Sequence, residues 1–168
     1  MVSVNADTYD ILAQPYPGTE GLKPRALHLA RFYERVGETA HKLDPDLLIV
    51  VPDQFNNSTK QFALARRPRI LGAVYSFEYY APNWNPRGKH RLALYENRAH
   101  EWNYPTWVLE FTAFNCPCGG LTTSPDPHWR SDTRNFLQAA RSDNVGWTIH
   151  RFSYFENRTL LRLLRNGL

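Results

Sequence analysis

The stretch Thr106-Trp107-Val108-Leu109-Glu110-Phe111 decides the fold class. It is an apolar run of strand length that carries a carboxylate near its exit. A carboxylate at the end of a buried strand costs desolvation free energy unless a neighbouring group uses or pairs it. The run therefore predicts a buried strand whose end holds a functional or a paired acid.

Other short apolar runs along the chain also end in polar or aromatic residues. They are Tyr9-Asp10-Ile11-Leu12-Ala13-Gln14-Pro15, Val74-Tyr75-Ser76-Phe77-Glu78-Tyr79-Tyr80 and Val145-Gly146-Trp147-Thr148-Ile149-His150. Strand ends of this kind, repeated along a chain, suggest a site at the carboxyl-terminal face of a parallel barrel.

Strand and helix patterns alternate around these runs. We expect strands at about 8–13, 47–51, 70–80, 106–111 and 145–150, and helices at about 24–42, 58–65, 90–101, 131–141 and 156–165. Near-continuously apolar strands that alternate with helices predict βαβ units and a parallel sheet. The expected fold class is α/β, in a single domain over 1–168. No glycine-rich phosphate-binding motif follows a strand, which disfavours a nucleotide-binding sheet.

Composition narrows the class of partner. The chain has 168 residues, of which 42% are hydrophobic and 14% aromatic, so we expect a globular protein. Its net charge is +4, but the basic residues are scattered apart from small clusters at 66–69 and in the tail, and we expect no nucleic-acid partner. No apolar window approaches the length of a membrane span, and no signal peptide is visible, so cytoplasmic localisation is the default expectation.

The two cysteines, Cys116 and Cys118, lie two residues apart in a loop sequence. A disulfide between them would be strained, and no second pair of Cys or His residues completes a zinc site. We expect two thiols, no metal site and no cofactor.

With its strand ends in this order, the chain resembles the second half, strands 4 to 8, of a family 5 glycoside hydrolase of the endoglucanase and endoglycoceramidase type. The run that ends Ala13-Gln14-Pro15 looks like strand 4, which normally ends Asn-Glu-Pro, and 29–47 looks like the next helix and strand 5. Glu78-Tyr79-Tyr80 resembles strand 6, normally His-x-Tyr, and Leu109-Glu110-Phe111 resembles strand 7. The run that ends at His150 resembles strand 8, which usually carries a sugar-stacking Trp there. The resemblance implies a parallel (β/α) half-barrel, TIM-barrel-like.

The resemblance also implies roles for particular residues. Glu110 occupies the position of the nucleophile of a retaining glycosidase, and Tyr80 is placed to hydrogen-bond to it. Gln14 occupies the acid/base position, where it keeps the shape but has no proton to deliver. Glu78 stands where the family has His. The expected substrate-binding residues are Tyr80, His150, Trp84 and Trp147.

Three functions stay open on these grounds. The first is a catalytically impaired relative whose pocket binds a β-linked oligosaccharide or the glycan of a glycolipid. The second is a weak retaining β-glycosidase with Glu110 as nucleophile and Glu78 as acid, since like-charge coupling can raise the pKa of one carboxyl of a pair. The third is a structural or interaction protein with a vestigial pocket. In that case Glu78 is neutralised by His150 or an Arg, and His150 is a structural histidine.

A half-barrel leaves two strand edges with unpaired backbone groups beside an apolar layer. A second copy could close the barrel around a two-fold axis, so we expect a homodimer. The alternatives are an open sheet capped by the N-terminal segment, or a separate chain that supplies strands 1 to 3.

Overall fold

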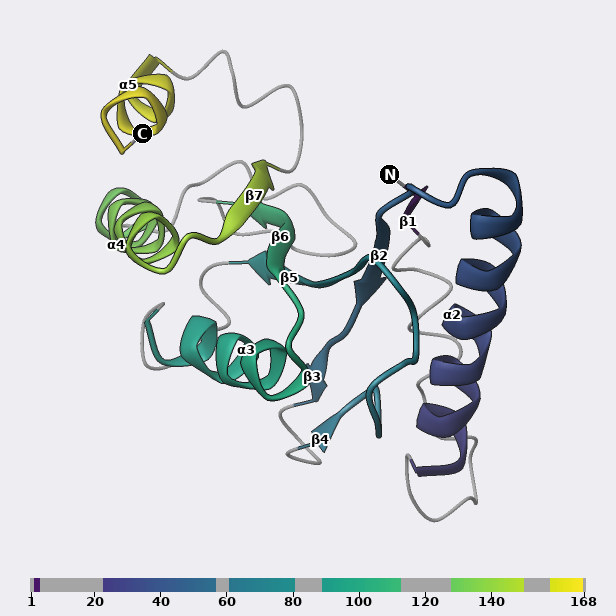
Figure 1. Ribbon diagram of the computed structural model, residues 1–168. Coiled ribbons are helices and arrows are strands. Elements are labelled where there is room, and N and C mark those ends of the chain that lie inside the picture. Colours follow the sequence, from purple (N-terminus) through teal and green to yellow (C-terminus); the bar gives the residue numbers. More distant parts are fainter. Residues whose placement is uncertain are drawn as a thin grey trace, which may run out of the picture. The chain divides into compact units, whose positions relative to one another are not determined.

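The computed structural model describes residues 2–3, 23–56, 61–80, 89–112, 128–149 and 158–167. The chain forms two compact units, 1–76 and 77–168, and the boundary falls within strand β5 (Ala73–Tyr80). Figure 1 shows strands and helices in alternation through both units. The expectation of a single domain stays a prediction.

In the described part of the first unit, parallel strands pack beside one long helix. Strand β2 (Ile49–Pro52) pairs with β1 (Val2–Ser3) on one side and with β5 on the other, both in parallel. Helix α2 (Lys23–Leu43) lies alongside β2, and the buried Tyr33 hydroxyl donates to the carbonyl of Pro52 at 3.2 Å (Figure 1). All four residues of β2 are buried, as the uninterrupted apolar run predicts.

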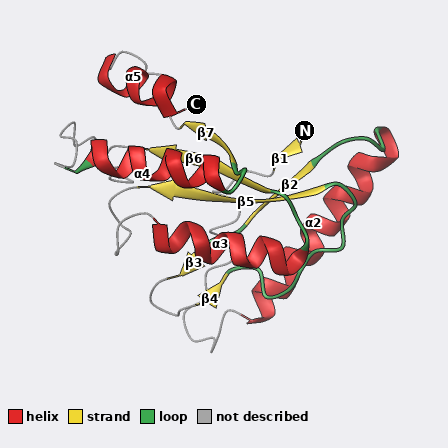
Figure 2. Ribbon diagram, turned by 60° about the vertical axis from the view of Figure 1, so that its left-hand side comes forward, coloured by secondary structure: helices red, strands yellow, loops and turns green. Residues whose placement is uncertain are grey.

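The second unit repeats the alternation with shorter helices. Strand β5 continues into it and is followed by α3 (Lys89–Trp102), β6 (Thr106–Thr112), α4 (Trp129–Ser142), β7 (Gly146–Ile149) and α5 (Arg158–Gly167). The strand order is β5-β6-β7, and β6 and β7 run parallel. Figure 2 shows the strands of this unit with α3 and α4 beside them.

Aromatic rings join these strands to the helices. Phe77 of β5 stacks on Tyr95 of α3 with ring centroids 4.0 Å apart. Phe136 of α4 contacts both Tyr79 of β5, at 5.0 Å, and Phe111 of β6, at 4.4 Å. Much of the high aromatic content therefore packs the core of this unit.

The expected helices at 24–42, 90–101, 131–141 and 156–165 are confirmed, as are the four later strands. Strand β5 begins at Ala73 rather than at 70, because Gly72 adopts a positive φ of 63° in a turn. The expected strand at 8–13 lies outside the described residues.

The expected helix at 58–65 is wrong. Gln61–Phe62 forms strand β4, which pairs antiparallel with β3 (Phe55–Asn56). The amide of Ala63 donates to the carbonyl of Gln54 at 2.9 Å, and the amide of Leu64 donates to the Asp53 carboxylate at 2.9 Å. These donors bind residues about ten positions back, so they do not form helical bonds.

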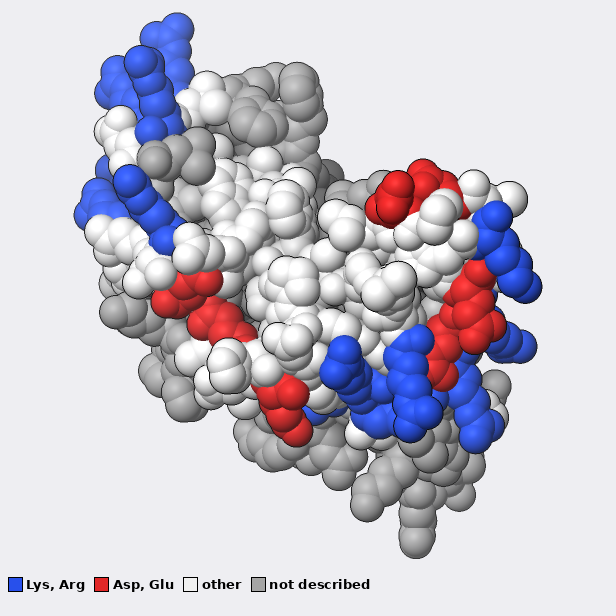
Figure 3. Space-filling model, viewed as in Figure 1, with Lys and Arg blue, Asp and Glu red and all other residues white. Residues whose placement is uncertain are grey.

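Arginines of α4 and α5 gather in one region of the second unit (Figure 3). Both helices pack together. The exposed arginines are Arg130, Arg134, Arg141, Arg158, Arg162 and Arg165. On α5 they recur at helical spacing opposite the buried Leu164, which makes this helix strongly amphipathic.

Candidate functional site

Glu110 lies near the carboxyl end of β6, where the strand pairing is irregular. The register joins Trp107 to Gly146 and Val108 to Trp147, but then joins Phe111 to Ile149. Three steps along β6 thus match two steps along β7, so β6 contains one extra residue, a β-bulge at Leu109–Glu110. Glu110 itself is half-buried.

One face of the β6–β7 pair packs toward α4. Phe111 is 2% exposed, and its ring contacts Phe136 of α4 and, edge to face at 5.2 Å, Trp147. Val108 is fully buried and is the register partner of Trp147, so it shares this face. Val108, Phe111 and Trp147 therefore form the face that α4 covers.

Strand alternation predicts that Val108 and Glu110 share a face, with Leu109 and Phe111 directed to the helices. The expectation for Phe111 is confirmed by its ring contact with α4. The expectation that Val108 lies on the face opposite Phe111 is wrong: both lie on the face that α4 covers, because the bulge between them interrupts the alternation.

The opposite face of this pair is built from Trp107, Gly146 and Thr148. The Trp107 ring lies on Gly146 so closely that a Cβ there would come within 2.3 Å of it. The Trp107 indole N–H donates to the Thr148 hydroxyl at 3.3 Å. That hydroxyl donates in turn to the carbonyl of Leu109 and lies 3.4 Å from the carbonyl of Val108.

The other predicted site residues are described only in part. Glu78 is half-buried on β5, the neighbour of β6, and both Glu78 and Glu110 have interaction partners in the structure. The backbone of Tyr80 ends β5. Trp147 is half-buried with its ring against Phe111. Gln14, Trp84, His150 and the side chain of Tyr80 lie outside the described part, so their roles stay predictions.

Asp53 is a buried acid that the sequence analysis missed. It follows the last residue of β2 and is 2% exposed. Its Oδ1 accepts hydrogen bonds from the amides of Gln54 and Leu64, both at 2.9 Å, and its Oδ2 accepts the hydroxyl of Tyr75 at 2.8 Å. The rule applied to Glu110, a carboxylate at the exit of a buried strand, would have found it. Because the amides of Gln54 and Leu64 flank the paired strands β3 and β4, Asp53 stabilises this pair.

Asp53 also acts on its neighbour Tyr33. Burial, and secondarily the negative charge of Asp53, raises the pKa of the Tyr33 phenol well above its usual value. Tyr33 therefore stays neutral and serves as a hydrogen-bond donor to the end of β2.

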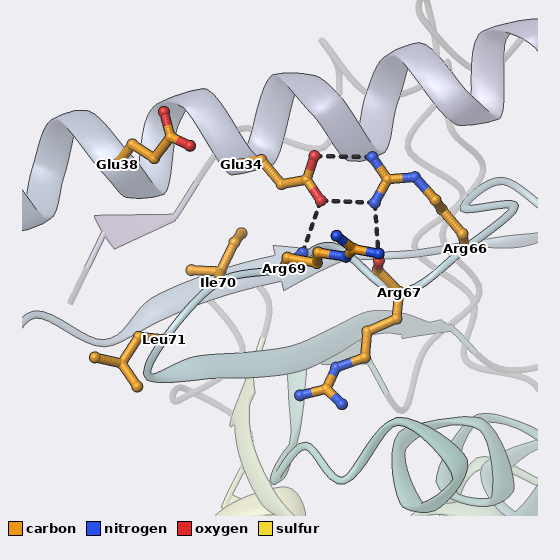
Figure 4. Close-up of a pocket in the computed structure, with 7 residues that line it drawn as sticks. All are labelled: Glu34, Glu38, Arg66, Arg67, Arg69, Ile70 and Leu71. Atoms are coloured by element: carbon orange, nitrogen blue, oxygen red, sulfur yellow. Dashed lines mark hydrogen bonds and ion pairs between the residues drawn. The ribbon is translucent and has the colours of Figure 1, made fainter.

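A charged hollow of about 940 Å³ lies beside α2 in the first unit (Figure 4). Its central contact is a two-pronged ion pair, in which the Arg66 guanidinium binds the Glu34 carboxylate at 2.6 and 2.8 Å. The amide of Arg69 adds a third bond to Glu34, at 2.8 Å. The hydrogen bond from Arg66, with the amide of Arg69 and the charges of Arg66 and Arg69, lowers the pKa of Glu34 to about 2. This network ties the segment 66–69 to α2.

A second acid with a perturbed pKa lies between helices of the second unit. Burial, and then the charge and hydrogen bond of Asp143, raises the pKa of Glu96 to about 7. Its Oε1 is buried and makes no hydrogen bond within the described residues. Burial and the nearby acid Asp143, at the end of α4, thus both favour the protonated form of Glu96 on α3.

The described residues include no cluster of three or more His, Cys, Asp or Glu side chains that could hold a metal ion. None of the described helices combines the length and apolar character that crossing a bilayer requires.

The sequence matches no known family model, and no curated protein is significantly similar to it. Solved structures do share its fold. An endo-β-1,4-glucanase from Xanthomonas axonopodis pv. citri, solved with a triple mutation, is 17% identical with a TM-score of 0.55. The match covers 74% of this chain and 44% of that protein.

Two further structures are similar to the same degree. A β-glucanase from Saccharophagus degradans, solved with cellotetraose, is 12% identical, with a TM-score of 0.53 over 84% of this chain and 48% of that one. Endo-glycoceramidase II from a Rhodococcus species, solved with a five-membered iminocyclitol, is 20% identical, with a TM-score of 0.50 over 72% and 30%.

The chain spans less than half the length of each of these proteins. Its fold is α/β, with parallel strands that alternate with helices, and it matches about half of the TIM barrel of family 5 glycoside hydrolases. The expected fold class is confirmed.

Proposed function

We propose that this protein is a glycan-binding relative of family 5 glycoside hydrolases, in which Glu110 is the nucleophile position and proton donation is impaired. The observation that carries the proposal is a half-buried carboxylate on a β-bulge near the carboxyl end of β6, in a fold that matches half of such a barrel. Active sites of TIM barrels lie at the carboxyl ends of the strands.

The chemistry of this site follows from its carboxyl groups. A retaining glycosidase needs a nucleophile and a proton donor about 5–5.5 Å apart. Gln14, at the donor position by resemblance, has no acidic proton. General acid help contributes typically about 10²–10⁴-fold, so we expect negligible hydrolysis of unactivated β-glucans and glycosphingolipids.

An activated aryl glycoside bypasses the missing acid. The Glu110 carboxylate would attack the anomeric carbon, the bond from that carbon to the aryl oxygen would break, and the phenolate would leave with the bonding electron pair. Because a dinitrophenolate needs no proton to leave, a 2,4-dinitrophenyl 2-deoxy-2-fluoro-β-cellobioside tests the nucleophile alone. A fluorosugar adduct on Glu110, detected by mass spectrometry and absent in Glu110→Gln, is the expected result.

Binding is tested separately with cellotetraose, chosen because the similar Saccharophagus glucanase was solved with it. We expect saturable binding by calorimetry. If the protein shows no binding and forms no adduct, only a structural role remains. Family-typical turnover of an unactivated β-glucan that is abolished in Glu110→Gln would instead favour a working glycosidase with Glu78 as acid.

A further inference from the structure

The side on which Glu110 lies depends on the bulge. Val108 and Phe111 both belong to the face covered by α4, although they are three residues apart. In a regular strand that begins with Val108 on this face, Glu110 would also point toward α4. With the extra residue, both Leu109 and Glu110 fit between the helix-facing residues Val108 and Phe111. Phe111 then occupies the helix-facing position that Glu110 would have in a regular strand.

The bulge is held from the neighbouring strand by a side chain. A bulge leaves backbone groups without their regular ladder partner, and here the Thr148 hydroxyl donates to the carbonyl of Leu109. Thr148 accepts a hydrogen bond in turn from the indole N–H of Trp107, whose ring packs against Gly146. Gly146 therefore admits the ring, the ring orients the hydroxyl, and the hydroxyl binds the bulged backbone.

We infer that Thr148 is a positioning residue for Glu110: its hydroxyl holds the Leu109–Glu110 bulge that turns the Glu110 carboxylate to the face opposite α4. This inference rests on the proposed function for the role of Glu110 as nucleophile. Bulges are rare in parallel strand pairs and frequent beside active sites, where they redirect a side chain. A displacement of about 1 Å at a reacting group can cost about 10²-fold in rate.

The test compares three variants. Thr148→Val removes the hydroxyl at nearly constant shape, and Thr148→Ser keeps it. Thr133→Val is the matched control, because the buried Thr133 hydroxyl also donates to a backbone carbonyl, that of Trp129 at 2.7 Å, but on α4. Thermal unfolding of each variant checks that the fold is intact.

Two measurements are made on each variant. The first is the inactivation kinetics of the dinitrophenyl fluorocellobioside. We expect Thr148→Val to lower the rate constant for adduct formation by about 10²-fold, with a less than about threefold change in inhibitor affinity. Thr148→Ser should restore the rate to within about fivefold, and Thr133→Val should leave it unchanged.

The second measurement is the ¹³C NMR resonance of the Glu110 side-chain carboxyl, assigned by its loss in Glu110→Gln. This resonance should move in Thr148→Val alone.

The two measurements separate the inference from the proposed function. If the wild type forms no fluorosugar adduct but the Glu110 resonance still differs between wild type and Thr148→Val, the nucleophile role is refuted and the positioning role stands. If the Glu110 resonance is the same in wild type and Thr148→Val, the positioning role is overturned, whether or not the wild type forms the adduct. A movement of equal size in Thr133→Val would also overturn it, because the effect would then be general loosening.

Discussion

At the scale of single residues, hydrogen bonds fix two of the described acids to the fold. Asp53 is saturated by three hydrogen bonds from its own unit. Glu34 is fixed by Arg66 and by the amide of Arg69. Glu110 differs from both, because it lies on a strand irregularity at the end of a buried strand. Asp53 and Glu34 therefore stabilise their own unit, whereas the proposed nucleophile is the acid on the bulge.

Loss of the Asp53 carboxylate should be costly. Asp53→Ala leaves the amide of Leu64 and the hydroxyl of Tyr75 without the acceptor that binds them, and each buried unsatisfied group costs about 1–3 kcal/mol. We expect the free energy of unfolding in urea to fall by more than about 2 kcal/mol. Asp44→Ala is the control, since the Asp44 carboxylate is exposed and accepts the nearby amide of Asp46. Equal effects of the two changes would contradict the role of Asp53.

Glu96 should make stability pH-dependent. Its pKa is raised from 4.5 to about 7, so between these values the folded state binds more protons than the unfolded state. The free energy of unfolding therefore falls as pH rises from about 4.5 to about 7. Glu96→Gln, neutral at every pH, should flatten this part of the profile measured by urea unfolding. An identical slope in wild type and variant would show that Glu96 titrates normally.

At the scale of elements, the pairing of β6 with β7 is the most informative contact. Its register contains the bulge at Leu109–Glu110, and the Trp107 ring packs directly against Gly146. Neither β6 nor β7 alone would have this geometry. The site depends on a strand pair rather than on a single strand.

Gly146→Ala tests that packing. The new Cβ would come within 2.3 Å of the Trp107 ring, so the ring or the strand must move, and overpacking of this kind costs about 1–3 kcal/mol. We expect a lower midpoint of thermal unfolding and a changed indole N–H resonance of Trp107. Gly37→Ala in α2 is the control, because its Cβ would meet the side chain of Ile70, with Cγ2 nearest at 2.9 Å, and the change gains helix propensity. A neutral Gly146→Ala would contradict the close contact.

At the scale of the whole molecule, the strand order ends at β7, whose only partner among the described strands is β6. An edge strand offers unpaired backbone groups to another strand. We expect the protein to form a homodimer at micromolar concentration, with β7 or its flanking helices in the contact. Light scattering measures the mass directly, and a well-folded monomer at that concentration would refute the dimer.

The amino-acid pattern was sufficient to predict the long helices and the four later strands of the parallel sheet. Residues 24–42 were expected to be helical and α2 spans Lys23–Leu43, and 106–111 was expected to be a strand and β6 spans Thr106–Thr112. These predictions succeeded because apolar periodicity within a window of ten to twenty residues is a local signal. The fold likeness to half of a family 5 barrel agrees with the order of the strand ends.

Contacts between distant residues formed the antiparallel pair β3–β4 and the bulge in β6, and the local pattern predicted neither. The paired strands β3 and β4 stand where a helix was expected, and Asp53 binds the amide of Leu64, 11 residues along the chain. The bulge at Glu110 exists only in the pairing of β6 with β7, and Thr148, which binds it, lies 39 residues from Leu109. Contacts between residues so far apart leave no periodic trace in the sequence, so the face taken by Glu110 could not be read from its own strand.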